Sequence, residues 1–266
     1  MSRVRRAVLP AAGRGTRMLP FSLAVPKELA PLGSRPAIHL VLDEAAAAGI
    51  EEAIVVVAPD KPLVRRYLEL AQDEGAWPGI GLRFAVQEEP TGLADAITVC
   101  GDLLEGEPFA LLLPDNLPLA PDYRLGALLG LWSERGRNGV GVLEIDSTWS
   151  GLYGNSGRIE HRAIAPGVLA IDRLHDKESG WLHVPAGSRV MRACGRYVFG
   201  PDFLERIEAS RAGARGEISE VPAVQLLATE GLLLGAVLPS PLFDVGHPRG
   251  LLAASAFLAG ASAAPE

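Results

Sequence analysis

The sequence predicts an α/β fold built on a largely parallel sheet, and three observations support it. Apolar runs of four to six residues alternate with amphipathic stretches along most of the 266 residues, the pattern of repeated strand–helix units. Several of these runs are apolar throughout, as expected of strands buried on both faces. The alternation weakens only between about residues 146 and 192, where Gly, Ser, His and Pro are scattered and loops or short antiparallel pieces are expected.

The elements follow from this pattern in chain order. The first strand, AVLPAA (7–12), runs into a glycine turn and a basic loop. The helix over 35–50 has Pro36 near its start, an apolar face, and Gly49 at its end. Further strands are expected at 52–59, 82–87, 109–116 and 139–145, and further helices at 62–75, 92–104 and 122–136. After the irregular stretch we expect a strand and helix over 193–211, a helix over 217–231, and a strand, a short irregular piece and a closing helix over 232–260.

Composition excludes several classes of protein. A chain with 48% hydrophobic and 21% charged residues is globular, and its length suits one domain with appendages. The net charge of −7 argues against a nucleic-acid binder, which needs clustered Lys and Arg. Cys100 and Cys194 lack CxxC spacing, so neither a zinc site nor a disulfide framework is expected, and a reducing cytoplasm fits. No apolar run is long enough for a signal sequence or a membrane span, so we expect a cytoplasmic protein without membrane contact.

The glycine turn after the first strand predicts a phosphate-binding loop. A dinucleotide fingerprint requires a third glycine where Met18 stands, and a Walker A loop requires a lysine that is missing from this register. The remaining interpretation is a loop whose backbone N–H groups approach phosphate oxygens, with Arg14, Arg17 and Lys27 supplying positive charge. The alternative is a tight surface turn with solvated arginines.

The stretch LPAAGRGTRMLP, followed by VPKELAPL, resembles the signature of bacterial sugar-1-phosphate nucleotidyltransferases, and its prolines are most similar to the UTP–glucose-1-phosphate uridylyltransferase branch. The segments AVQEEPTGLADAI, LLLPDN, YGNSG, GRYVF and FDVG extend the resemblance in the same order. It implies a three-layer α/β/α, Rossmann-like nucleotidyltransferase fold in a single domain, residues 1–266. Within it, residues 1–145 would form the nucleotide-binding half, 146–246 the sugar-phosphate-binding half, and 247–266 a C-terminal helix.

The resemblance also implies an enzyme that transfers a uridylyl group from UTP to a hexose 1-phosphate, with Mg²⁺ as cofactor. It implies that Arg17 holds the triphosphate, that Lys27 contacts phosphate near the reacting centre, and that Asp115 and Asp244 bind the metal, Asp115 being catalytic as well. The implied nucleotide-binding residues are Ala11, Ala12, Gly13, Gly15, Thr16, Glu28, Gln87 and Gly92. The implied sugar-phosphate-binding residues are Asn116, Gly154, Asp176 and Lys177.

Alternatives remain open for several of these residues, most of them in the second half of the chain. Asp244 could be a strand-end turn residue, and Asn116 could cap a loop. The family's Glu-Lys-Pro and Ser-Asn segments are replaced by LHDKES and SRVMRAC, and another register would use Asp172 and Arg173. These departures leave two further hypotheses, a variant that uses dTTP or another sugar, and a weakly catalytic nucleotide-sugar-binding paralogue with a regulatory role. A homo-oligomer is also left open.

Overall fold

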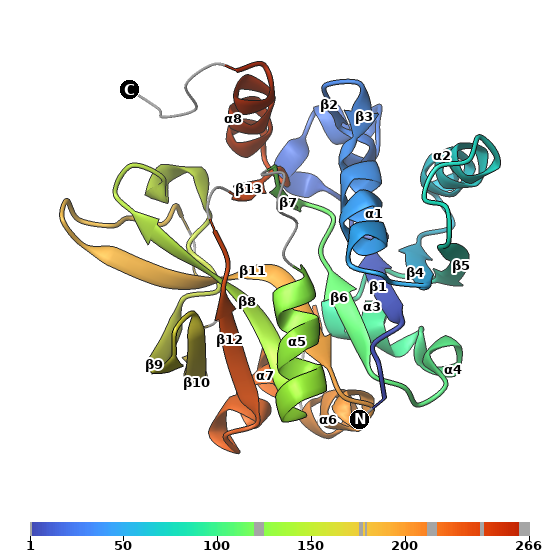
Figure 1. The fold of residues 1–266 in the computed structure, drawn as a ribbon. Coiled ribbons are helices and arrows are strands. Elements are labelled where there is room, and N and C mark those ends of the chain that lie inside the picture. The colour runs from blue at the N-terminus through green and yellow to red at the C-terminus, as the bar shows by residue number, and fades with distance from the viewer. Residues whose placement is uncertain are drawn as a thin grey trace.

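The computed structural model describes residues 2–119, 125–175, 178, 180–211, 217–239 and 242–260. One nine-stranded sheet runs through its centre in the order β5-β4-β1-β6-β11-β8-β12-β10-β9 (Figure 1). Its strands are β1 (Arg6–Pro10), β4 (Glu52–Val57), β5 (Gly81–Val86), β6 (Phe109–Leu112), β8 (Asn138–Asp146), β9 (Ile159–Ala165), β10 (Val168–Leu174), β11 (Arg189–Phe199) and β12 (Leu233–Val237). Two small antiparallel pairs complete the strands: β2 (Pro31–Leu32) with β3 (Arg35–Pro36), and β7 (Asn116–Pro118) with β13 (Leu242–Asp244).

The first half of the chain builds the parallel part of the sheet. β1 lies parallel between β4 and β6, and β5 continues this part beyond β4. β11 then pairs antiparallel with both β6 and β8, whereas β12 is parallel to β8. β9 and β10 form an antiparallel hairpin in the stretch expected to be irregular. The predicted mixed α/β sheet is therefore confirmed, and its antiparallel pairings lie in the second half.

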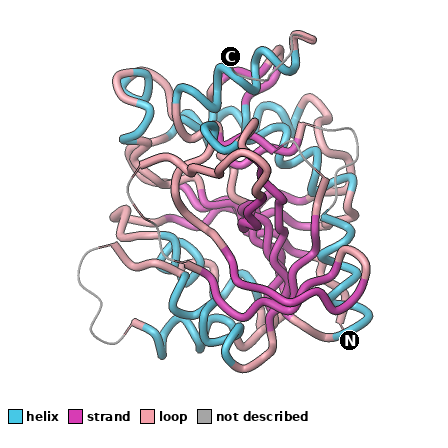
Figure 2. The backbone as a smooth tube through the Cα atoms, turned by 90° about the vertical axis from the view of Figure 1, so that its left-hand side faces the viewer, coloured by secondary structure: helices cyan, strands magenta, loops and turns pink. Residues whose placement is uncertain are grey.

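Helices cover both faces of the sheet (Figure 2). One face packs against α1 (Ala37–Ala47), α2 (Pro62–Asp73) and α5 (Leu125–Arg135), and α8 (Pro248–Leu258) joins the same core while it packs on β13 and β2. The other packs against α3 (Leu93–Thr98), α4 (Gly101–Leu104), α6 (Phe203–Ser210) and α7 (Val221–Thr229). Alternate residues of β1 enter different cores, Ala7 and Leu9 on the first face and Val8 on the second, as the twofold period of a strand requires. The three-layer α/β/α arrangement is confirmed.

Two elements differ from the sequence prediction. The helix expected over 92–104 is divided into α3 and α4, because Cys100 N donates to Ile97 O in a 3₁₀ step that interrupts the α pattern. β11 begins at Arg189 rather than near residue 193, because it pairs with β8 along this whole stretch. A register shift in β11 contains Gly195 at φ +70°, so this long strand bends as it passes the end of β6.

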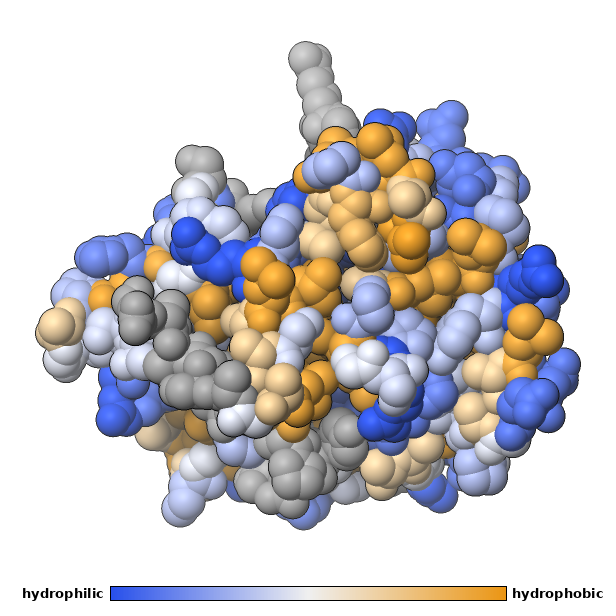
Figure 3. Space-filling view, turned by 90° about the horizontal axis from the view of Figure 1, so that it is seen from above, coloured by the Kyte–Doolittle hydropathy of each residue, from blue (hydrophilic) through white to orange (hydrophobic). Residues whose placement is uncertain are grey.

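The surface at the α8 end carries apolar side chains, as the view from above shows (Figure 3). Leu252 on α8 is 71% exposed.

Among the described residues, no helix has both the length and the apolar content needed to span a bilayer.

Candidate active site

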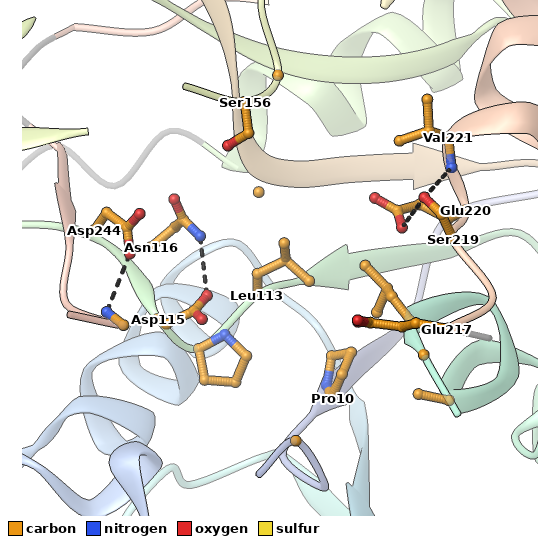
Figure 4. Close-up of a pocket in the computed structure, with 18 of the residues that line it drawn as sticks. Pro10, Leu113, Asp115, Asn116, Ser156, Glu217, Ser219, Glu220, Val221 and Asp244 are labelled. Atoms are coloured by element: carbon orange, nitrogen blue, oxygen red, sulfur yellow. Dashed lines mark hydrogen bonds between the residues drawn. The ribbon is translucent and has the colours of Figure 1, made fainter. Parts of the chain in front are cut away.

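A cavity of about 920 Å³ opens at the carboxyl ends of the parallel strands (Figure 4). Pro10 at the end of β1, Gln87 after β5 and Leu113 after β6 all line it. Ser156, Glu217 and residues 219–221 contribute from the second half of the chain. This is the sheet edge at which the sequence predicts ligands to bind, and the volume lies in the range of small-molecule sites.

The glycine loop forms one wall of the cavity. Gly15 adopts φ +66° directly before the 3₁₀ helix η1 (Thr16–Met18), a conformation that suits glycine. A Cβ at Gly15 would lie 3.3 Å from Ser22 Cβ, so the loop is also closely packed. Ala12, Gly13, Gly15 and Thr16, which the resemblance implies as nucleotide-binding residues, line the cavity. Ala11 does not, because it is buried and its N–H donates to Val56 O in the sheet (2.8 Å).

Two cations and two carboxylates meet beside this loop. Lys27 Nζ lies 2.6 Å from Asp115 Oδ2, and Arg17 Nη2 lies 3.6 Å from the same oxygen. Arg17 Nη1 lies 3.7 Å from Asp244 Oδ2. The carboxylates are neighbours because β7 and β13 pair Asn116 with Asp244, and Asn116 Nδ2 also donates to Asp115 Oδ1 (3.0 Å). The structure therefore unites four residues that are spread over more than two hundred positions of the sequence.

The charges of this cluster stabilise one another. Burial opposes ionisation of Asp115, but Lys27 and Arg17 lower its pKa to about 2. Burial likewise acts to lower the pKa of Lys27, and Asp115 with Glu28 outweighs that effect and raises it. At neutral pH Lys27 is therefore a cation and Asp115 an anion.

Gly246 allows this close approach. A Cβ at this position would lie 2.8 Å from Arg17 Nη2, 2.9 Å from Asp115 Oδ2 and 3.1 Å from Asp244 Oδ1. Gly246 N also donates to Asp244 Oδ1 (3.1 Å), which orients that carboxylate. In the sequence Gly246 is only a sign of a turn, and its packing role follows from residues distant along the chain.

The cluster has the donors of a magnesium site rather than of a zinc site. Asp115 and Asp244 are hard oxygen ligands, and no group of three or more His, Cys, Asp or Glu side chains in the described part of the chain could hold a metal. Mg²⁺ commonly takes one or two carboxylates and completes its octahedron with substrate phosphates and water. The residues present fit an ion that arrives with a nucleotide.

At the far end of the glycine wall, Gln87 is held in a single orientation. Its side chain is buried, and Nε2 donates to Gly92 O (3.0 Å) and to Asp95 Oδ2 (2.9 Å). Both partners can only accept, so the amide nitrogen is assigned by its surroundings and Oε1 is the atom free to accept from a ligand. Gly92 has φ +126°, and a Cβ there would lie 2.3 Å from Ile218 O, so glycine is needed at this position.

The profile of the nucleotidyl transferase family matches residues 6–260. The chain belongs to this family. It is 29% identical over 271 residues to a UTP–glucose-1-phosphate uridylyltransferase of Bacillus subtilis, covering 95% of this chain and 90% of the relative. It is 27% identical over 268 residues to UTP–glucose-1-phosphate uridylyltransferase 1 of Staphylococcus saprophyticus, covering 94% and 91%. A UDP-glucose pyrophosphorylase solved with UDP-glucose has the same fold, with a TM-score of 0.80, 24% identity and coverage of 97% of this chain and 99% of that one.

The resemblance stated from the sequence is thus confirmed, and the chain is an enzyme of the nucleotidyltransferase class.

Glu28 of this chain lies behind the cavity rather than in it. It is 2% exposed, Lys61 Nζ lies 3.4 Å from its Oε2, and burial raises its pKa. Lys61 also donates to Gly13 O, so the pair supports the glycine loop from behind. Sequence reasoning missed Lys61, which stands in no motif beside the loop.

The sugar-side residues are brought together only in part. Asn116 lines the cavity, whereas Gly154 forms a bridge with Trp181 and does not line it. Asp176 and Lys177 lie outside the described residues. In the alternative register, Asp172 points to solvent and pairs with Arg162 (2.9 Å), and Arg173 is exposed as well.

Several cavity residues were missed in the sequence. They come from β11, from the residues just before β9 and just after β10, and from the segment before α7, and they include Ser156, His175, Arg192, Tyr197, Glu217 and Ser219. Residues 189–192 fall in the stretch for which loops or short antiparallel pieces were expected, so they were not assigned to the strand that follows. RVMRA does not alternate charged and apolar residues, because Val190 and Met191 are adjacent, so the sequence offers no clear period-two signal for this part of the strand.

Proposed function

We propose that the chain catalyses transfer of a uridylyl group from UTP to a hexose 1-phosphate, glucose 1-phosphate first among the candidates, with Mg²⁺. The observation that carries the proposal is the cluster of Arg17 and Lys27 with Asp115 and Asp244, at the same sheet edge as a Gln87 amide that accepts through Oε1. Uracil offers an N3–H donor to such an acceptor. The named activity of the B. subtilis and S. saprophyticus relatives supports the same assignment.

In the proposed reaction an oxygen of the sugar phosphate attacks the α-phosphorus of UTP. The bond from that phosphorus to the oxygen bridging α and β breaks, and pyrophosphate leaves with the electron pair. The attacking oxygen is already an anion at neutral pH, so no general base is required. Catalysis then consists of positioning the two anions in line and neutralising their charge.

The residues divide this work. Arg17, which lies half exposed at the loop, binds the triphosphate and the departing pyrophosphate. Lys27 exchanges its contact with Asp115 for one with phosphate near the reacting centre. Asp115 and Asp244 would hold Mg²⁺, which supplies charge neutralisation to the phosphates when bound.

The charge balance of the cluster argues for the metal. Its two cations are matched by two carboxylates, so the protein side is close to neutral. A triphosphate and a sugar phosphate together bring several negative charges. A divalent cation therefore has to accompany them if the centre is to bind both.

The base end leaves the thymidylyl alternative open, because thymine carries the same N3–H as uracil. We expect pyrophosphate release from UTP and glucose 1-phosphate with Mg²⁺, and loss of it with excess chelator or in Asp115→Ala. A matrix of UTP, dTTP, CTP and ATP against several hexose 1-phosphates identifies the substrates. Binding of UTP without turnover across the whole matrix would instead support the regulatory paralogue, and an unchanged rate in Asp115→Ala would refute the metal assignment.

A further inference from the structure

Arg192 is a buried cation without a partner charge among the described residues. It lies in β11, lines the cavity and is only 4% exposed. Its Nε donates to Ser156 O (3.3 Å), and its Nη1 is buried with no hydrogen-bond partner among the described residues. No described carboxylate lies within ion-pair distance of it, in contrast to Arg17 and Lys27. Buried charges in proteins are nearly always paired, so this guanidinium calls for an anion that the described residues do not provide.

The guanidinium is held in place for such a partner. It lies over the ring of Tyr153, 4.7 Å from the ring centre. Tyr153 O–H donates to Leu242 O, and burial raises the pKa of Tyr153 to about 12, so the ring is neutral and attracts a cation through its face. Ala193 N donates to Gly157 O (2.7 Å), which ties β11 to the same turn. Little side-chain entropy remains to be lost when an anion binds.

The position of Arg192 separates it from the triphosphate site. Its hydrogen-bond partner Ser156 lies on the side of the cavity away from Pro10, where β1 ends and the glycine loop begins (Figure 4). Under the proposed function, on which this inference rests, UTP occupies the glycine-loop side. The second substrate therefore lies against the wall that Ser156 and Arg192 form.

We infer that Arg192 binds an oxyanion of the sugar substrate. A guanidinium whose Nη1 has no partner among the described residues suits a phosphate or a carboxylate equally. The oxyanion is supplied either by the 1-phosphate that every substrate carries or by the C6 carboxylate of a uronic acid 1-phosphate. Arg192 thus supplies a cation within the stretch in which the family's Ser-Asn segment is replaced.

The test compares Arg192→Gln, Arg192→Lys and a matched control. Arg249→Gln is the control because Arg249 also lies 4.7 Å from a ring centre, that of Trp181, and donates to a backbone carbonyl of the same segment, Gly151 O (2.9 Å), but is exposed and outside the cavity. We expect Arg192→Gln to raise KM for the sugar 1-phosphate about tenfold to a hundredfold, with KM for UTP unchanged. Arg192→Lys should recover part of the loss, and Arg249→Gln should match the wild type.

Glucose 1-phosphate and glucuronate 1-phosphate distinguish the two sources of the oxyanion. An equal loss on both sugars assigns Arg192 to the 1-phosphate. A wild-type preference for glucuronate 1-phosphate that disappears in Arg192→Gln assigns it to the carboxylate. The inference is overturned if KM for both sugars stays within about twofold of wild type, or if KM for UTP rises as much as KM for the sugar.

A binding measurement separates this inference from the proposed function. If the wild type releases no pyrophosphate with any substrate pair, the proposed function fails, and thermal melts with glucose 1-phosphate and with glucuronate 1-phosphate then test Arg192 alone. Stabilisation of the wild type that is absent in Arg192→Gln supports the inference; equal shifts, or no shift in the wild type, overturn it. Arg192→Met, which keeps the packing on Tyr153, serves as the second neutral variant if Arg192→Gln does not fold.

Discussion

Asp95 should control the choice of base, although nothing places it in contact with the nucleotide. Its Oδ2 accepts from Gln87 Nε2 (2.9 Å) and Thr91 Oγ1 (2.7 Å), and its Oδ1 accepts from Arg211 Nη2 (2.7 Å). Burial opposes its ionisation, but these hydrogen bonds outweigh burial and hold the pKa of Asp95 below its ordinary value. It is therefore an acceptor at neutral pH and, under the proposed function, keeps Gln87 Oε1 available to the N3–H of uracil.

The strength of this control follows from the two hydrogen bonds that Gln87 donates. If the side-chain amide of Gln87 turned by 180°, Nε2 would lose its bonds to the Asp95 carboxylate and to Gly92 O. Oε1 of Gln87 would then face these two oxygens, neither of which can donate to it. With about 1 kcal/mol for the neutral bond and about 2 kcal/mol for the charged one, the observed orientation is favoured by about 3 kcal/mol. N3 of cytosine has no hydrogen and needs a donor, which Gln87 can supply only in the turned orientation. The binding of cytosine is therefore weakened by this free-energy difference.

Asp95→Asn should remove most of the preference. Arg211 can only donate, so the asparagine introduced at this position would turn its oxygen towards Arg211 and its NH₂ towards Gln87. That NH₂ would donate to Oε1 of Gln87 in the turned orientation. Only the loss of the bond from Gln87 to Gly92 O would then disfavour this orientation. We expect the ratio of kcat/KM for UTP over CTP, measured by pyrophosphate release, to fall about a hundredfold.

The control for this prediction is Thr91→Val, which removes one donor to Asp95 but keeps the carboxylate and should change the ratio little. Because its pKa is lowered, Asp95 is fully ionised at any pH above the range in which an ordinary aspartate titrates. The preference for UTP should therefore be constant from about pH 5 upward. A folded Asp95→Asn enzyme whose UTP/CTP ratio is that of the wild type would refute the reasoning.

Three further changes test the site and its support. Asp115→Asn should lower kcat by about a hundredfold or more in a steady-state assay, and a loss below about tenfold would contradict the assigned role. Gly246→Ala should lower activity, because its Cβ would lie 2.8–3.1 Å from three charged groups, while Gly126→Ala, where nothing lies within 4 Å, should not. Glu44 lies 2.8 Å from the guanidinium of Arg196, which is 1% exposed, so Glu44→Gln leaves this cation buried without its anion. The change should lower the free energy of unfolding, measured in urea, by about 3 kcal/mol. A decrease below about 1 kcal/mol would contradict the stabilising role of the buried pair.

The sequence predicts best what depends on neighbouring residues. The apolar run of β6 followed by Pro114 and Asp115 placed a carboxylate at the ligand edge, because strand period and strand end are local features. The glycine loop was predicted for the same reason. In the second half, β11 was begun too late, since its first residues look irregular and are extended only by pairing with β8.

Contacts between distant segments could not be predicted in this way. The proximity of Asp115 and Asp244 depends on the β7–β13 pair, which joins residues more than a hundred positions apart. The same is true of Gly92, whose need for glycine comes from the backbone of Ile218. A sequence shows which residue types are present, whereas tertiary packing decides which of them meet.

Under the proposed function, the two sides of the cavity would bind anions by different physical means. On the glycine-loop side each cation already has a carboxylate, so a phosphate has to displace an acid or arrive with a divalent cation. On the Ser156 side, Arg192 has no acid among the described residues and is ready to bind an anion without exchange. Because of these local cations, a net charge of −7 does not prevent the chain from binding two phosphorylated substrates. Local pairing within the cavity, rather than the field of the whole protein, decides where each anion binds.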